Sequence, residues 1–422
     1  MCALIKIKKN AIAMAGRAAV SVLLLFAAGA TSNALAAMAQ SPLFLASQLK
    51  PNIIFTLDDS GSMNYEYLPD TAGYSTFGTI SSTSLSVAKF RSSSLNGVFY
   101  NPAVRYRPWQ KEDGTYYADS TPSAALDDPR SSGTTNLVNT SNYPDRYLAF
   151  YYVYNGAGVG SIGNFTRKAI YGSGPYDKAA GRTDCAGSTC TYAEEITNFA
   201  NWYTYYRKRT FTAIAGISQA FNDLDGNYRI GYGRINSGAK TVDGVSSNTV
   251  RLGVRDFTGA DRSTWFTELF TAPASGYTPL RRAMDDVGRY YSRSDTKGPW
   301  AENPGVSKGT EYACRKCFHI LMTDGYWNST AAYTTGTSDG DSTNGPIIDG
   351  AVRYVAATAG SYYNLSASNT LADVAMYYWK NDLRADLANK VPVSTTDPAF
   401  WQHITQYTVG LGLSGTLTYP TF

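Results

Sequence analysis

The sequence predicts an α/β protein with a mostly parallel central sheet and helices on both faces. Two short apolar runs, 52–57 and 317–323, each end directly in a polar loop. Continuous apolar runs of this length are typical of parallel strands that are covered on both faces. Between and after the two runs lie segments with the apolar spacing of helices, which we expect to provide that cover. The polar loops would then lie at the carboxyl ends of the strands, where open α/β sheets place their ligand sites.

The first of these loops carries the strongest candidate site. It contains Asp58, Ser60 and Ser62 at alternate positions. A carboxylate and two hydroxyls in one tight turn supply hard oxygen ligands, which suit Mg²⁺, Mn²⁺ or Ca²⁺, and Gly61 lets the turn close without a Cβ. Taken alone, this motif is also explained by an ordinary polar turn, because serine and aspartate are common turn residues.

Regular elements follow in an order that supports a layered fold. The pair Thr191 and Glu194 forms a capping box that opens a helix, and apolar spacing carries this helix to Phe221. Insertions are expected at about 63–190, 292–313 and 326–369, within a domain over 50–422. The other predicted elements are a strand at 228–235, an edge strand at 249–257, a helix around 262–270, a helix from 280 to 291, a helix at 370–386 and a last strand at 403–411. The first insertion would lie at the rim beside the polar loop, where binding specificity is expected.

Two further loops add oxygen-bearing side chains at the same predicted edge. Thr278 precedes Pro279, which fits the first position of the helix from Leu280. Thr278 is therefore either the N-cap of that helix or a third hydroxyl of the polar site. The second apolar strand ends in Thr323, Asp324 and Gly325, which places another carboxylate at the sheet edge.

The combination of D-x-S-x-S, the threonine of G-Y-T-P-L and the T-D-G at a strand end resembles the von Willebrand factor A fold and its metal-ion-dependent adhesion site. The resemblance implies that Ser60, Ser62 and Thr278 bind Mg²⁺, or alternatively Mn²⁺ or Ca²⁺. It also implies that one or both of Asp58 and Asp324 act through water. A carboxylate or similar oxygen of a host or surface ligand would complete the coordination shell, so that cation and ligand binding depend on each other.

A narrower resemblance rests on the blocks at 50–64, 98–109 and 369–379, which are similar to the PilY-type proteins of bacterial type IV pili. It implies a pilus tip-associated adhesin and assembly factor, exported to the cell surface, with minor pilins of the tip complex as partners. Proteins of this family normally continue into a C-terminal β-propeller, which we expect to be absent from this chain. The alternative hypothesis is a purely structural factor that primes pilus assembly without metal-dependent ligand binding.

The N-terminus predicts a secretory signal peptide over 1–36, with cleavage after 39 as a second choice. A basic front is followed by the apolar stretch Ala18–Ala28 and a small-residue site, and the apolar stretch is too short to span a membrane. Without 1–36 the chain has 33 basic and 33 acidic residues. This balance gives no support for a nucleic-acid partner.

Four cysteines remain after the signal peptide, which in an exported protein indicates two disulfides with three possible pairings. We favour the local pairs Cys185–Cys190 and Cys314–Cys317. A redox role for the C-x-x-C at 314–317 is a less favoured alternative, since it precedes an apolar strand. A zinc site is less favoured still, because the two pairs lie far apart in sequence.

Catalysis is not predicted. The sequence shows no Ser/His/Asp set, and neither of its two histidines, His319 and His403, lies in a loop beside the candidate ligands. His319 falls inside an apolar strand, where a core role is expected. The acidic run at 339–345 lacks the glycine and glutamate that an EF-hand loop needs at 344 and 350. An enzyme, either a redox protein or a metal-dependent hydrolase, is therefore the least favoured hypothesis.

Overall fold

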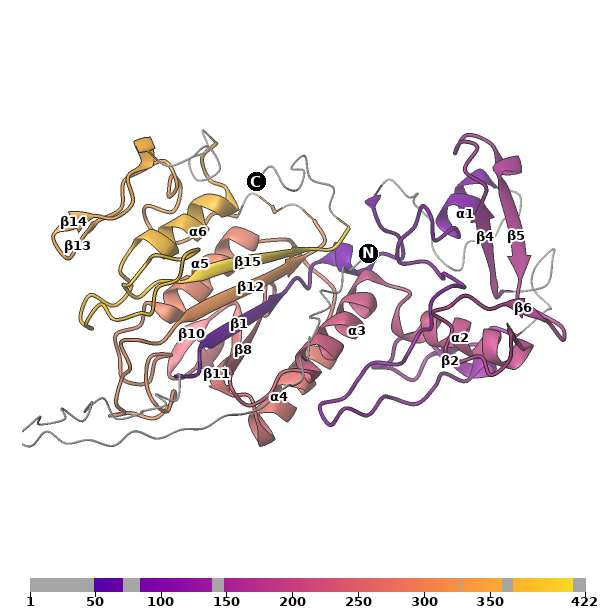
Figure 1. Ribbon diagram of the computed structural model, residues 1–422, viewed down its shortest axis with the longest axis horizontal. Helices are drawn as coiled ribbons and strands as arrows, with labels where there is room; N and C mark the ends of the chain where they lie inside the picture. The colour runs from indigo at the N-terminus through magenta and orange to yellow at the C-terminus, as the bar shows by residue number, and fades with distance from the viewer. Residues whose placement is uncertain are drawn as a thin grey trace, which may run out of the picture. The chain divides into compact units, whose positions relative to one another are not determined.

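A five-stranded sheet forms the centre of the fold (Figure 1). Its strands are, in spatial order, β11 (Val250–Asp256), β8 (Arg229–Arg234), β1 (Asn52–Leu57), β12 (Cys317–Thr323) and β15 (Thr405–Gly410). β1 pairs in parallel with β8 and β12, and β12 pairs in parallel with β15. β11 lies at one edge, as the sequence predicted, and it runs antiparallel to β8. The predicted α/β class with a mostly parallel sheet is thus confirmed.

The computed structural model describes residues 49–70, 84–138, 148–325, 327–328, 330–358 and 367–412. From Leu49 onward the chain forms one compact unit. The predicted signal peptide lies outside the described residues. Among the described residues, no helix combines the length and the apolar character that a bilayer crossing requires.

Helices cover both faces of the sheet, and Figure 1 shows the two pairs on opposite sides of it. The helices are α3 (Arg209–Asn222) and α4 (Gly259–Phe270) on one face, and α5 (Leu280–Tyr291) and α6 (Leu371–Lys380) on the other. Alternate side chains of a strand point to opposite faces. Accordingly, Phe55 and Leu57 of β1 pack with α3 and α4, whereas Ile54 packs with α5 and α6.

The strand order places a topological switch point between β1 and β12. From β1, the chain adds β8 and β11 on one side, and later adds β12 and β15 on the other. Open α/β sheets leave a crevice at the carboxyl ends of the strands where the order reverses in this way. The residues that directly follow those two strand ends are Asp58 and Asp324.

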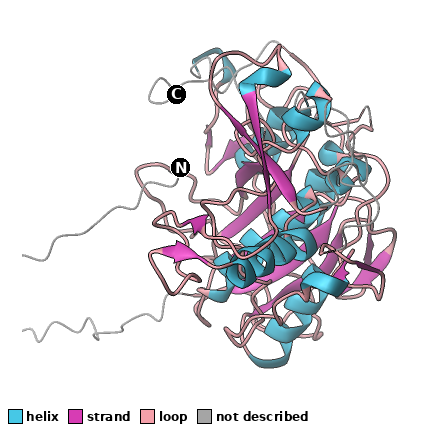
Figure 2. Ribbon diagram, turned by 90° about the vertical axis from the view of Figure 1, so that its right-hand side faces the viewer, coloured by secondary structure: helices cyan, strands magenta, loops and turns pink. Residues whose placement is uncertain are grey.

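The insertion after β1 builds a core of its own from aromatic side chains. This core joins α2 (Tyr192–Tyr205) to the preceding loops, with Phe99, Tyr100 and Trp202 fully buried in it. Trp109 connects this region to the sheet layer, because its Nε1 donates to the Tyr205 and Phe211 carbonyls at 3.0 and 3.1 Å. Much of the chain outside the sheet is loop, drawn pink in Figure 2.

The remaining described elements are short. They are α1 (Leu85–Phe90), the 3-10 helices Gly61–Asn64, Pro122–Ala124, Ile162–Asn164 and Ala356–Thr358, and the paired strands β2 (Ala125–Leu126) with β3 (Thr134–Thr135), β4 (Phe150–Tyr154) with β5 (Phe165–Ala169), β6 (Tyr176–Asp177) with β7 (Thr189–Cys190), β9 (Lys240–Val242) with β10 (Val245–Ser247), and β13 (Ile347–Ile348) with β14 (Ala351–Val352).

Two predicted helices differ from the structure. The segment 191–221 is not one helix, because α2 ends at Tyr205 and α3 begins at Arg209. The break occurs because α2 packs into the core of the insertion whereas α3 packs on the sheet, and one straight helix cannot serve both. The helix predicted to reach 386 ends at Lys380, where Asn381 adopts an extended C-cap conformation.

Candidate functional site

Asp58 ties the carboxyl ends of β1 and β12 together. Its Oδ1 accepts a hydrogen bond from the backbone N–H of Ser60 at 2.9 Å, and its Oδ2 accepts one from the Thr323 hydroxyl at 2.6 Å. The Asp58 side chain is fully buried. The first bond folds the D-x-S turn, and the second fixes that turn against the neighbouring strand.

Ser60, Ser62 and Asp324 form a continuous chain of oxygen atoms beside Asp58. The hydroxyls of Ser60 and Ser62 lie 3.1 Å apart, and the Ser62 hydroxyl donates to Asp324 Oδ1 at 2.9 Å. Ser62 and Asp324 are 262 residues apart in sequence. The structure therefore brings four of the five predicted ligands into one hydrogen-bonded cluster at the switch point.

The loop that carries the fifth predicted ligand, Thr278, docks on the same turn. The N–H of Gly61 donates to the Gly276 carbonyl at 3.1 Å, and the N–H of Ser275 donates to the Asp59 carbonyl at 2.7 Å. The N-cap of α5 is Pro279, and no side chain caps this helix. The N-cap alternative for Thr278 is thus wrong, while the ligand alternative stays a prediction.

Arg209 is a site residue that the sequence reasoning missed. Its Nη1 donates to Asp324 Oδ2 at 2.8 Å, and both side chains are almost completely buried. Its Nε donates to the Tyr67 carbonyl at 2.7 Å, and its Nη2 pairs with Asp70 at 2.5 Å. Arg209 is the first residue of α3, 115 positions before its partner, and no local pattern links the two.

Burial makes the carboxylates of this turn costly to ionise. Burial raises the pKa of Asp58, and the hydrogen bonds from Ser60 and Thr323 oppose this rise. Burial likewise raises the pKa of Asp59 to about 6, against the opposing effects of the Asn236 N–H and of Arg234. A nearby positive charge would favour the ionised form of such groups.

The chemistry of the donor set fits a hard divalent cation. Carboxylate and hydroxyl oxygens are the ligands of Mg²⁺, Mn²⁺ and Ca²⁺, whereas zinc and copper sites use nitrogen and sulfur. Among the described residues, no group of three or more His, Cys, Asp and Glu side chains could hold a metal. The cluster at the switch point is of a different kind, with two carboxylates supplemented by serine hydroxyls.

The two histidines occupy other places. His319 is buried in β12 with its Nε2 2.9 Å from the Thr56 hydroxyl, and burial lowers its pKa to about 4. His403 Nε2 lies 3.0 Å from Asp397 Oδ2. His319 therefore has the core position that its place in an apolar strand predicted.

The cysteines form one of the two favoured disulfides. Cys185 and Cys190 are bonded, whereas Cys314 and Cys317 are free thiols. The prediction of a second bridge differs from the structure because Cys317 begins β12 and its thiol is directed into the core, 3.5 Å from Asn52 Nδ2. Cys314 is partly exposed in the preceding loop.

Fold and geometry together define an α/β domain with an oxygen-ligand cluster at the switch point of its sheet. In sequence, the chain is similar to the type IV pilus biogenesis factor PilY1 of Pseudomonas aeruginosa strain PAK, with 34% identity over 437 aligned positions. It is 32% identical to the protein of the same name from strain PAO1. Both alignments cover 96% of this chain and 35% of the relative, so the chain spans about a third of the length of these curated relatives. No family model and no solved structure matches the chain. The predicted resemblance to PilY-type proteins is confirmed as sequence similarity, and the von Willebrand factor A assignment stays a prediction.

Proposed function

We propose that this chain is a divalent-cation-dependent binding domain of a type IV pilus biogenesis protein, exported and acting at the pilus tip on the cell surface. The name and similarity of the PilY1 relatives support the pilus role. The observation that carries the binding role is the cluster of Ser60, Ser62 and Asp324 beside Asp58 at the switch point. The mostly parallel sheet, covered by helices on both faces, fits the von Willebrand factor A-like architecture that the motif implies.

In this proposal Ser60 and Ser62 hold the cation through their hydroxyl oxygens, and Asp58 and Asp324 supply the negative charge around it. Thr278 joins them from the loop that Gly61 anchors. When bound, the cation would offer a coordination position to an oxygen atom of a partner. Such a partner would present a carboxylate or similar group, as a minor pilin or a surface ligand can.

Arg209 would set the strength of this site. It occupies one oxygen of Asp324 and leaves the other to Ser62. The buried guanidinium thereby compensates part of the negative charge that the cation would meet, which limits how tightly the cation is held. A weakly held cation would have an incomplete coordination shell. An oxygen atom of the partner would complete that shell, so the bound cation would favour partner binding. The role we propose is therefore binding, with no covalent chemistry at this site.

Calorimetric titration of the purified chain with MgCl₂ and MnCl₂ tests the proposal. Ser62→Ala and Asp58→Asn are expected to weaken cation binding by at least about tenfold, because each removes an oxygen ligand or its charge. Ser173→Ala, which changes an exposed serine of the insertion, is the matched control and should bind as the wild type does. Circular dichroism verifies that each variant is folded. Absence of binding in the wild type, or unchanged affinity in both site variants, would overturn the proposal.

A cellular experiment separates adhesion from assembly. Strains carrying Ser62→Ala are expected to keep their pili and to lose surface attachment, because the cation site serves ligand binding. A different result would support the structural priming role. In that result a strain carries a variant of this chain that still binds Mg²⁺ normally when purified, and yet the strain loses its pili.

A further inference from the structure

A cavity lies in the region of the insertion and α2, and it shares no lining residue with the candidate metal site. It has a volume of about 540 Å³ and opens between the segments 105–108 and 116–119, Asp184 and the first three turns of α2. Of its thirteen lining residues, only Pro108 and Ala193 are aliphatic. The volume suits a small organic ligand, and the polar walls suit one with many hydrogen-bonding groups.

Two asparagines of α2 hold two of the lining segments of this cavity in place. Asn198 accepts a hydrogen bond from the N–H of Tyr106 at 2.7 Å, and Asn201 accepts one from the N–H of Ser120 at 2.7 Å. Asn201 also donates to Asp119 Oδ1 at 2.8 Å. Residues three apart on a helix lie on the same face. Both asparagines are buried, so α2 fixes the two walls relative to each other.

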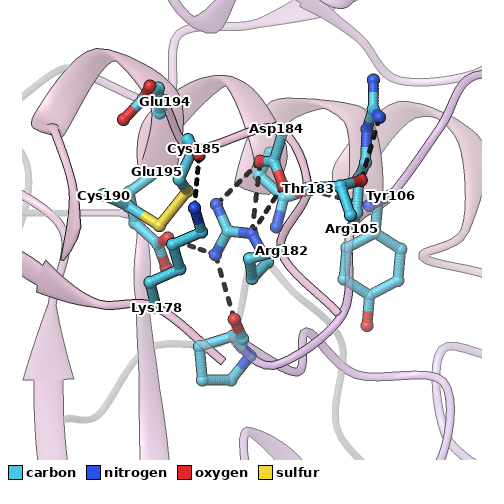
Figure 3. A network of polar contacts seen from close by, with 12 residues as sticks. Arg105, Tyr106, Lys178, Arg182, Thr183, Asp184, Cys185, Cys190, Glu194 and Glu195 are labelled. Atoms are coloured by element: carbon cyan, nitrogen blue, oxygen red, sulfur yellow. Dashed lines mark hydrogen bonds and ion pairs between the residues drawn. A yellow bond between two sulfur atoms is a disulfide. The ribbon is translucent and has the colours of Figure 1, made fainter. Parts of the chain in front are cut away.

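The third wall is fixed by a disulfide and by a buried arginine, as Figure 3 shows. Arg182 pairs with both oxygens of Asp184, with the shortest distance 2.9 Å, and donates to the Pro102 carbonyl at 2.9 Å. Its side chain is fully buried. The Cys185–Cys190 bond closes the loop that follows Asp184. The cavity is therefore preformed, which reduces the entropy lost when a ligand binds.

The acidic residues that line the cavity are already engaged by internal partners. Both oxygens of Asp184 are paired with Arg182, as described above. Glu194 accepts hydrogen bonds from the N–H groups of Thr191 and Ala186 at 2.8 and 2.9 Å. Asp119 Oδ1 accepts a hydrogen bond from the side-chain amide of Asn201. Asp184 is thus neutralised by Arg182, whereas Glu194 and Asp119 are bonded to neutral groups, keep their charges and can accept from the hydroxyls of a ligand.

The two arginines of the cavity have donors to spare. Arg105 and Arg107 flank the buried Tyr106 at alternate positions, and both are exposed. Arg105 donates one N–H to Thr183 Oγ1 at 3.1 Å, and Arg107 donates one to the Tyr116 hydroxyl at 3.2 Å. A guanidinium carries five N–H groups, and the structure shows no further hydrogen bond from either group within the described part of the chain. Guanidinium groups with free donors can pair with the acid group of a ligand.

We infer that this cavity binds a saccharide unit that carries a carboxylate, with Arg105 and Arg107 pairing with the acid group. The cavity is much larger than an inorganic anion needs. Its polar walls can form hydrogen bonds with the hydroxyls of a sugar, whereas an aliphatic side chain would leave them without partners. Tyr116 and Tyr117 add aromatic rings to the lining, and such rings combine an apolar face with a polar hydroxyl. This site is independent of the cation site of the proposed function.

Titration of the purified chain with glucuronic acid, followed by ligand-observed NMR in the presence of EDTA, tests the inference. Binding is expected in the wild type, and glucose should bind at least about tenfold more weakly, because it lacks the charge-assisted pairing. The double variant Arg105→Gln/Arg107→Gln should lose at least about tenfold in affinity. Arg289→Gln is the matched control, since that arginine has a 56% exposed side chain on α5.

Several outcomes would overturn the inference. Equal binding of glucose, or full binding by the double variant, would show that the arginines do not select an acid. Equal binding of N-acetylglutamate would assign the cavity to acidic protein side chains. Absence of binding by glucuronate, galacturonate and N-acetylneuraminate alike would leave no saccharide ligand. Ser62→Ala and EDTA should both leave saccharide binding unchanged, because the cavity is independent of the cation site. Failure of saccharide binding is therefore distinguishable from failure of cation binding. Loss of saccharide binding in Ser62→Ala or in EDTA would refute the independence of the cavity.

Discussion

Replacing Arg209 with methionine is expected to destabilise the cation-free chain strongly. The guanidinium lies 2.8 Å from Asp324 Oδ2, and the two side chains are 1% and 0% exposed. Methionine keeps the length and apolar stem that pack near the rings of Tyr65 and Tyr67, both 5.3 Å from the guanidinium carbon. The substitution therefore removes mainly the charge and its hydrogen bonds.

The magnitude follows from the burial of the pair. Removing one partner of a buried ion pair leaves an uncompensated charge and costs about 3–5 kcal/mol. Bound Mg²⁺ would supply a new positive charge beside Asp324 and recover part of that loss. At a concentration of 100 times its Kd, a ligand that binds only the folded state adds about 2.7 kcal/mol. The gain from Mg²⁺ should be larger in the variant than in the wild type, because the arginine no longer shares Asp324.

Urea denaturation followed by tryptophan fluorescence, in EDTA and in excess Mg²⁺, measures both effects. The control removes an exposed ion pair elsewhere: in Lys50→Met the lost side chain is 36% exposed and pairs with Asp256. It should cost less than about 1 kcal/mol. An Arg209→Met cost no larger than this control in EDTA would refute the reasoning. Equal Mg²⁺ stabilisation of wild type and variant would refute the proposed competition for Asp324.

Three further predictions concern other parts of the chain. His319 has a pKa of about 4 in the folded state and about 6.5 when unfolded, so only the unfolded state gains a proton between these values. The free energy of unfolding should therefore fall by about 3 kcal/mol as the pH drops from 7 to 4, as measured by urea denaturation. If the urea midpoint of His319→Gln falls as steeply with pH as that of the wild type, the prediction is wrong. Changing both Cys185 and Cys190 to serine opens a short loop and should cost about 2 kcal/mol in urea denaturation; no measurable loss would show that the bond stabilises nothing. Burial raises the pKa of Cys317 to about 12, so iodoacetamide at pH 8 should modify the partly exposed Cys314 and spare Cys317 until the chain unfolds, as read by mass spectrometry; equal labelling would contradict the buried position.

Much of the candidate site follows from local sequence signals. The two predicted strands at 52–57 and 317–323 are apolar runs, and each is followed at once by a carboxylate that the fold places at the sheet edge, Asp58 or Asp324. The capping boxes at Thr191 and Thr370 are also present in the structure. Such signals can be predicted because strand burial, turn formation and capping depend on neighbours within a few residues.

Other features depend on contacts between distant segments. The chain between Ile196 and Phe221 keeps helical spacing throughout, yet it divides between two cores. Spacing reports which side of a helix is apolar, but it does not report which surface that side meets. For the same reason the C-x-x-C spacing did not reveal that Cys317 is directed into the core.

The sequence by itself determined the sheet-edge loops and the types of ligand they carry, because the residues of a strand and of the turn that follows it are adjacent in the chain. Only the tertiary structure decided that Ser62 and Asp324 share a hydrogen bond, that Arg209 completes the cluster, and that Arg105 and Arg107 border a cavity of the insertion. These contacts join segments tens to hundreds of residues apart. Their geometry arises from the order of the strands and the packing of the insertion, which no local pattern encodes.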